Sequence, residues 1–95
     1  MFFAASIVAA QTNVKAIFSD LSEGDSGAEV VELQKILNTD LGVGLPVTGT
    51  FDAATNNVVI RFQNKYASEV LGPAGLKTGS GFVGLWTRLK LNQIL

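Results

Sequence analysis

The sequence contains no cysteine and no histidine. Without cysteine no disulfide can form, and the commonest protein ligands of zinc, haem iron and iron–sulfur clusters are missing. A Ser-His-Asp triad, a Cys-His dyad and every histidine general base are excluded for the same reason. We therefore expect no metal site and none of these common forms of catalysis.

Charged side chains are also scarce. They make up 16% of the residues, and 7 basic against 8 acidic side chains give a formal net charge of −1. A protein that binds duplex nucleic acid needs a basic face, so we expect no nucleic-acid partner. By contrast, 47% of the 95 residues are hydrophobic, which suits the core of a single domain.

The first ten residues, MFFAASIVAA, contain one polar side chain, Ser6. This stretch is too short to cross a bilayer, which takes ~20 apolar residues. It can be the remnant of a secretory signal peptide, because Val8 and Ala10 form a small-x-small pattern, although no basic residue precedes Lys15. In that case residues 1–10 would meet a membrane only transiently.

A second interpretation of the N-terminal segment stays equally open. Apolar residues recur there at alternating spacings of four and three, the pattern of a heptad seam on an amphipathic helix. Such a helix would allow self-association through residues 3–21. The seam consists of Phe3, Ile7, Ala10, Val14, Ile17 and Leu21.

Three helices are predicted beyond an acidic, glycine-containing boundary at residues 20–27. The first begins after Ser26, which can form a capping box with Glu29 three residues later. It ends at Gly42, a residue type that commonly terminates helices.

The second helix begins after Asp52, a good N-cap residue, and carries a stripe of inward-facing side chains at helical spacing. The third helix spans residues 85–94, and residues 67–82 before it are predicted as a long loop. The stripe of the second helix consists of Thr55, Val58, Val59, Phe62 and Tyr66. The inward-facing residues of the third are Leu85, Leu89 and Ile94.

A short motif occurs twice in the chain. Residues 49–55 (GTFDAAT) and residues 81–87 (GFVGLWT) both read G-x-Φ-[DG]-x-x-T, where Φ is apolar. Each copy has a glycine turn, an apolar side chain beside the helix N-cap, and threonine at the third helical position. The second and third helices are therefore predicted to begin in the same way.

Three patterns in this order resemble the signatures of the small peptidoglycan-binding domains. Residues 21–37 read L-x-x-G-x-x-G-x-x-V-x-x-L-Q-x-x-L, which resembles their opening helix. Residues 49–63 resemble a G-x-F-G-x-x-T turn that leads to a helix ending in Phe-Gln, with Asp52 where the family often has glycine. Residues 81–91 resemble the closing signature.

The resemblance covers residues 18–95 and implies an all-α domain, a compact three-helix bundle, to which residues 1–17 are an additional segment. It implies non-catalytic binding of bacterial cell-wall peptidoglycan, through the glycan strand or the stem peptide, by an exported protein of the cell wall, periplasm or cell surface. The motif residues with structural roles would be Gly27, Val30, Leu33, Gly49, Phe51, Asp52, Thr55, Phe62, Gly81, Gly84 and Thr87.

A structural subunit of a self-assembling cell-surface structure is the alternative function. It would reuse the same fold and associate through the apolar N-terminal helix, as the seam between residues 3 and 21 suggests.

Five side chains are candidates for contact with a ligand. Trp86 and Tyr66 can stack on sugar rings or pack within the domain, and Arg88 can pair with a stem-peptide carboxylate or lie on a solvated helix face. Gln34 and Gln63 each follow an apolar core position and can bind either a ligand or a loop backbone. For all five, the structural role is the one we favour.

Two patterns that elsewhere indicate catalysis or a cofactor do not support either here. Asp52 and Glu69 would be the paired acids of a glycosidase, but Asp52 is better explained as an N-cap. Residues 79–84 (GSGFVG) read G-x-G-x-x-G without the flanking strands that a dinucleotide site requires. We expect no enzyme activity and no cofactor.

Overall fold

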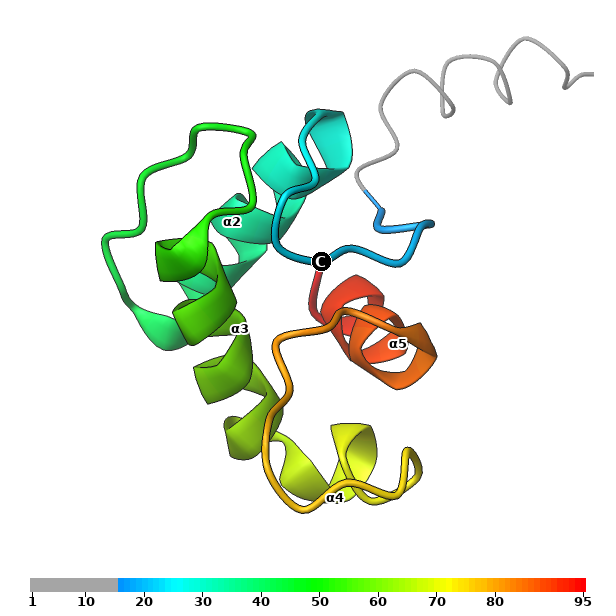
Figure 1. Cartoon of the computed structure of the whole chain (residues 1–95). Helices are drawn as coiled ribbons and strands as arrows, with labels where there is room; N and C mark the ends of the chain where they lie inside the picture. Colours follow the sequence, from blue (N-terminus) through cyan, green and yellow to red (C-terminus); the bar gives the residue numbers. More distant parts are fainter. Residues whose placement is uncertain (1–15) are drawn as a thin grey trace, which may run out of the picture.

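The computed structural model describes residues 16–95 and is shown in Figure 1. These residues form four α-helices and no strand longer than an isolated bridge. The all-α fold is therefore confirmed, with one short helix inside the stretch that was predicted as a loop. The helices are α2 (Ala28–Leu41), α3 (Ala53–Lys65), α4 (Ala67–Val70) and α5 (Leu85–Ile94).

Helices α2, α3 and α5 enclose one hydrophobic core, and α4 packs against α3 and α5 at one end of it (Figure 1). The predicted core positions Leu33, Phe51, Phe62 and Val83 are fully buried. The complete core cluster is Ile17, Leu21, Val30, Leu33, Ile36, Leu37, Leu45, Phe51, Val59, Phe62, Val83 and Leu91.

The predicted capping box at the start of α2 does not form. The N-cap is Gly27, which makes no side-chain hydrogen bond, and the chain at Ser26 pairs instead with the loop before α3. The Glu29 carboxylate accepts hydrogen bonds from the backbone N–H groups of Phe18 (3.0 Å) and Ser19 (2.9 Å). Glu29 therefore holds the N-terminal segment and does not cap its own helix.

The other predicted helix boundaries are confirmed. Gly42 adopts the left-handed conformation (φ 67°) and ends α2, with its N–H donating to the Asn38 carbonyl at 2.9 Å. Asp52 caps α3, because its carboxylate accepts the Thr55 N–H at 3.0 Å. That hydrogen bond lowers the pKa of Asp52 below its ordinary value.

A buried glutamine joins α2 to the loop that precedes α3. The Gln34 side chain is 1% exposed, and its Oε1 atom accepts the Gly49 N–H at 2.9 Å. Its amide nitrogen donates to the Thr50 carbonyl and to the Thr55 hydroxyl, both at 3.0 Å. Both ends of the amide are thus satisfied within the domain.

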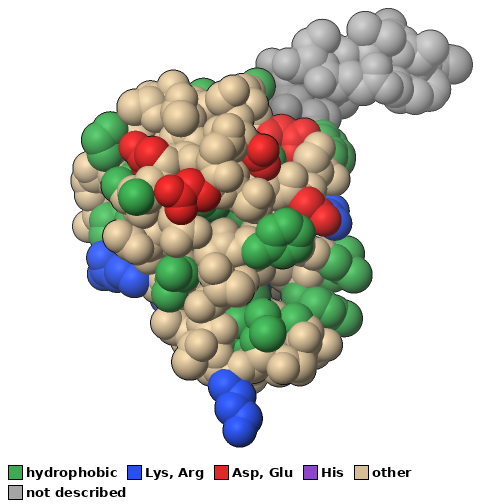
Figure 2. Space-filling view, viewed as in Figure 1, with side chains coloured by type: hydrophobic (Ala, Val, Ile, Leu, Met, Phe, Trp, Pro, Cys, Tyr) green, Lys and Arg blue, Asp and Glu red, His purple; other side chains and the backbone are tan. Residues whose placement is uncertain are grey.

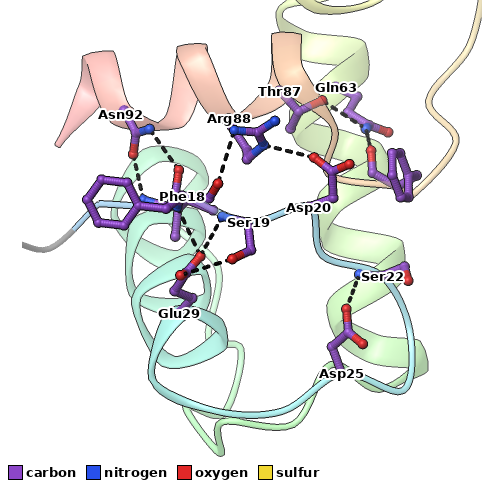
Figure 3. Close-up of polar contacts among 12 residues, drawn as sticks. Phe18, Ser19, Asp20, Ser22, Asp25, Glu29, Gln63, Thr87, Arg88 and Asn92 are labelled. Carbon is purple, nitrogen blue, oxygen red and sulfur yellow. Dashed lines mark hydrogen bonds and ion pairs between the residues drawn. The ribbon is translucent and has the colours of Figure 1, made fainter.

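Gln63 makes the same connection from α3 to the loop that precedes α5. Its Oε1 atom accepts the Gly81 N–H at 2.9 Å, and its nitrogen donates to the Phe82 carbonyl at 2.8 Å and the Thr87 hydroxyl at 3.2 Å. Figure 3 shows Gln63 reaching from α3 to Thr87 on α5. We call each such arrangement a glutamine clamp.

The two clamps use the same three positions of the repeated motif: its glycine, the residue after it, and its final threonine. The glycines have positive φ angles of 84° at Gly49 and 87° at Gly81, which a residue with a side chain rarely adopts. A Cβ atom at Gly81 would also overlap the side chain of Asn56. The repeat therefore encodes both a helix start and a docking point for the preceding helix.

Residues 17–21 form an extended segment that lies between α2 and α5 (Figure 3). The Asn92 side chain accepts the Ile17 N–H at 2.8 Å and donates to the Ile17 carbonyl at 3.0 Å. Leu21 exchanges two backbone hydrogen bonds with Val83, at 3.1 and 2.8 Å. The segment is therefore part of the folded domain.

The position of this segment shows that the predicted heptad seam is wrong at its C-terminal end. Ile17 and Leu21 are not helical, and both are buried in the domain's own core. Neither can contribute to a helical interface with another chain, and Ile17 lies in the core although the predicted domain began at residue 18. The other seam residues and the possible cleavage pattern lie outside the described residues.

Replacing Gln63 with leucine should destabilise the domain by about 2–5 kcal/mol. The change keeps the volume but leaves the Gly81 N–H, the Phe82 carbonyl and the Thr87 hydroxyl without their buried partner. Urea unfolding followed by circular dichroism measures the loss. The control Gln93→Leu, at an exposed position of α5, should change stability by less than ~0.5 kcal/mol. Equal urea midpoints for Gln63→Leu and Gln93→Leu would contradict the stabilising role of the Gln63 clamp.

Asp52 should contribute to stability in a pH-dependent way. Because folding lowers its pKa from 3.8, its contribution is present above that value and is lost as the pH falls through the lower, folded-state pKa. Asp52→Asn keeps a capping oxygen without the charge, so its deficit relative to wild type should persist from about pH 7 to about pH 4 and shrink below that range. Asp52→Ala should be destabilised across the whole range. Urea midpoints measured against pH test this, and a constant difference between wild type and Asp52→Asn would contradict it.

Candidate functional site

A group of large hydrophobic side chains lies exposed around the start of α5. Each is between 40% and 52% exposed, although side chains of this kind usually pack in a core. Figure 2 shows hydrophobic side chains gathered over this side of the molecule. We call the group the apolar face; it consists of Leu76, Phe82, Leu85, Trp86 and Leu89.

The exposure of Leu85 and Leu89 corrects the predicted orientation of α5. The clamp requires Thr87 to face Gln63, so the inward positions of the helix are Thr87 and, one turn later, Leu91. Leu85 and Leu89 lie two residues to either side of Thr87 and therefore point to the opposite side. Only Ile94, which packs partly buried against the core, matches the prediction.

The apolar face lines two neighbouring hollows that share Trp86. The first has a volume of about 200 Å³ and lies between the end of α4, the loop that follows it and the first turn of α5. The second, of about 280 Å³, lies beside it along α4 and α5 and is lined by Glu69, Trp86, Leu89, Lys90 and Gln93. The side chains that line the first hollow are mainly apolar and include Val70, Leu71, Leu76, Phe82, Leu85 and Trp86.

The two hollows differ in charge. No charged side chain lines the first. The second contains Glu69 and Lys90, which form an ion pair with an Nζ to Oε1 distance of 2.8 Å. The Lys90 ammonium also lies 4.6 Å from the centroid of the Tyr66 ring, in a cation–π contact. The site therefore carries no net charge.

Among the predicted ligand residues, Trp86 is the exposed one on this face, with 40% of its surface exposed. Tyr66 is half-buried: its hydroxyl donates to Asp40 at 2.7 Å, and its ring lies 5.0 Å from that of Phe62. Asp40 also accepts a hydrogen bond from Lys65, which raises the pKa of that lysine. Tyr66 therefore acts in packing.

Arg88 lies on α5 and is directed to the N-terminal segment (Figure 3), and it lines neither hollow. Its Nε atom donates to the Asp20 carboxylate at 3.0 Å and its Nη1 atom donates to the Phe18 carbonyl at 3.2 Å. These two contacts use two of the five N–H donors of the guanidinium and hold it beside the N-terminal segment.

Gln34 and Gln63 are both engaged within the domain, and Gln63 also borders the first hollow. Each is 1% exposed, and every hydrogen-bonding group of each amide is used in a clamp. Their role is to hold loop backbones, the alternative that we favoured from the sequence.

The sequence does contain a signal for the apolar face. At three solvent-facing positions the first copy of the repeated motif has the small residues Thr50, Ala53 and Ala54, all exposed. The second copy has large apolar residues at the same positions: Phe82, Leu85 and Trp86. The shared fold does not require the larger side chains, because the first copy folds without them.

Neither a metal centre nor a membrane-spanning helix is found in the described part of the chain. Residues 16–95 bring no three His, Cys, Asp or Glu side chains together in a group that could hold a metal ion. No helix among these residues is long and apolar enough to cross a bilayer.

A family model described as "Putative peptidoglycan binding domain" matches residues 26–78 of the chain. The chain belongs to the peptidoglycan-binding domain family. The matched range includes α2, α3 and α4 of this peptidoglycan-binding domain, whereas the third signature and α5 lie beyond it. The second clamp shows that α5 nevertheless docks by the same contacts as α3.

Among solved structures, the domain is similar to a peptidoglycan-binding protein from Clostridioides difficile in complex with glutamine hydroxamate. The two share 33% sequence identity with a TM-score of 0.63, over 80% of this chain and 42% of that one. This chain therefore spans less than half the length of that protein. No curated protein matches the chain.

Core and surface leucines of α5 should respond differently to truncation. Leu91→Ala removes a fully buried side chain and should cost about 2–5 kcal/mol of unfolding free energy. Leu85→Ala and Leu89→Ala remove half-exposed side chains and should each cost less than ~1 kcal/mol. Urea unfolding of the three variants checks this order. A loss at Leu85 or Leu89 as large as that at Leu91 would contradict the described orientation of α5.

Proposed function

We propose that this domain binds bacterial cell-wall peptidoglycan without catalysis and holds the protein that carries it at the wall. The proposal is supported by family membership and, within the structure, by the apolar face. Three of the differences between the two copies of the motif are the observation that carries it: in the second copy, large side chains occupy exposed positions that hold threonine and alanine in the first.

An aromatic ring beside a shallow hollow suits a polysaccharide. Trp86 is 40% exposed and lines both hollows, of which the second also contains charged and polar side chains. Sugar rings have apolar faces and polar edges, so such a surface can stack on the ring and bond to its edge.

The proposed absence of catalysis is supported by the contacts of Asp52 and Glu69, the two carboxylates that could have served as the acids of a glycosidase. Asp52 is occupied as the N-cap of α3, and Glu69 is paired with Lys90. Because peptidoglycan lies outside the cytoplasmic membrane, the function requires export to the cell wall, periplasm or cell surface.

Purified sacculi should retain the domain at low salt. The variant Phe82→Thr/Leu85→Ala/Trp86→Ala, which installs the residues of the first motif copy, should fold but be retained at least about tenfold more weakly. The control Phe18→Ala removes an aromatic side chain that is 66% exposed and lines neither hollow, and it should bind like wild type.

Cosedimentation followed by quantification of the bound fraction measures this retention. Folded wild-type protein that stays in the supernatant would refute the proposed function. Release of soluble wall fragments by the domain would refute its non-catalytic part.

A further inference from the structure

We infer that the two hollows beside Trp86 bind the N-acetylated glycan strand of peptidoglycan and not its stem peptides; this inference rests on the proposed function. The first observation is charge. The first hollow has no charged lining side chain, and the charges of Glu69 and Lys90 in the second neutralise each other at 2.8 Å. In peptidoglycan the N-acetylated sugars are neutral wherever the lactyl carboxyl is amide-bonded to a stem peptide, whereas the stem peptides carry free carboxylates that need an available cation.

A stem-peptide carboxylate would meet unfavourable surroundings here. In the first hollow it would lose water without gaining a cation, which is costly for an ionised group. In the second it would compete with Glu69 for Lys90 and be repelled by the displaced carboxylate. Arg88, about half a turn of α5 from both Trp86 and Lys90, is held by Asp20 and Phe18 and lines neither hollow.

The first hollow matches an acetamido group. Its apolar side chains, among them Val70, Leu71 and Leu85, can surround the methyl. Ser80 on the same lining accepts the Phe82 N–H at 3.1 Å, and within residues 16–95 its own proton is given to no other group. That hydroxyl can donate to the acetamido carbonyl, so the hollow offers partners for both ends of the group.

The second hollow matches the hydroxyl edge of a sugar whose face lies on Trp86. A sugar hydroxyl both donates and accepts, and the hollow presents an acceptor on Glu69, a donor on Lys90 and both on Gln93. The Glu69–Lys90 pair presents an acceptor and a donor side by side without adding net charge. Together the hollows are complementary to a neutral, N-acetylated, hydroxyl-bearing ligand.

Trp86 is the only tryptophan, so its fluorescence reports directly on the site. A β-1,4-linked tetramer of N-acetylglucosamine should produce a saturable blue shift, because it displaces water from the indole. The matched tetramer of glucose, which has hydroxyl groups in place of the acetamido groups, should bind at least about tenfold more weakly. Absence of a shift with the acetylated tetramer, or equal affinity for both, would overturn the inference.

Glycan strands that an amidase has freed of their stem peptides, immobilised on beads, separate this inference from the proposed function. Stripping frees a lactyl carboxylate on each N-acetylmuramic acid but leaves every acetamido group and the neutral N-acetylglucosamine residues in place, so the domain should still be retained on the stripped strands. Retention on intact sacculi alone would overturn glycan recognition and leave wall binding standing. Loss of retention on both would refute the proposed function itself. The Phe82→Thr/Leu85→Ala/Trp86→Ala variant should lose both kinds of retention, and Phe18→Ala should lose neither.

Discussion

Two glutamine amides that are buried away from water, each bonded at both ends, determine how the helices of this domain are arranged. An amide without partners in such a place would cost free energy, so the fold is stable only when the following loop meets Gln34 or Gln63 at the right distance. Each clamp thereby sets the position of a loop and the rotation of the helix that the loop begins. Helix α2 positions α3 in this way, and α3 positions α5.

The apolar face follows from that chain of constraints. Because Thr87 must meet Gln63, the opposite side of α5 has to face solvent, whatever residues occupy it. The domain uses this side for Leu85 and Leu89, at some cost in solubility that an exposed apolar surface always carries. The buried contact between Gln63 and Thr87 and the exposed apolar face thus both follow from the rotation of α5 about its axis. The same contact that stabilises the domain therefore also orients its proposed binding surface.

Much of the fold could be predicted from the sequence because its signals are local. The helix end at Gly42, the N-cap at Asp52 and the 85–94 helix each depend on residues only a few positions away. The structure confirms all three predictions. The errors arose where a distant partner decided the outcome. Glu29 had a suitable partner in Ser26 but binds the N-terminal segment, which no local pattern indicates.

The candidate site was harder to predict for the same reason. Leucines at positions 85 and 89 have the spacing of a core stripe, and only the contact of Thr87 with α3 places them outside. Arg88 and Tyr66 were reasonable ligand residues, yet each meets a partner at least 26 positions away in sequence. The apolar face can be recognised when the two motif copies are compared position by position. The residues common to both copies are those that the fold requires, and the large apolar residues occur in the second copy alone.

The attachment of the N-terminal segment has a mechanical consequence. The backbone of Ile17 is held by Asn92 near one end of α5, and Trp86 lies at the other end of the same helix. Tension applied to the chain before residue 17, while the apolar face is engaged, would pass along about 10 Å of a single helix. Part of the load would also reach α2, because Glu29 accepts the backbone N–H groups of Phe18 and Ser19, whereas α3 makes no hydrogen bond to this segment within the described residues.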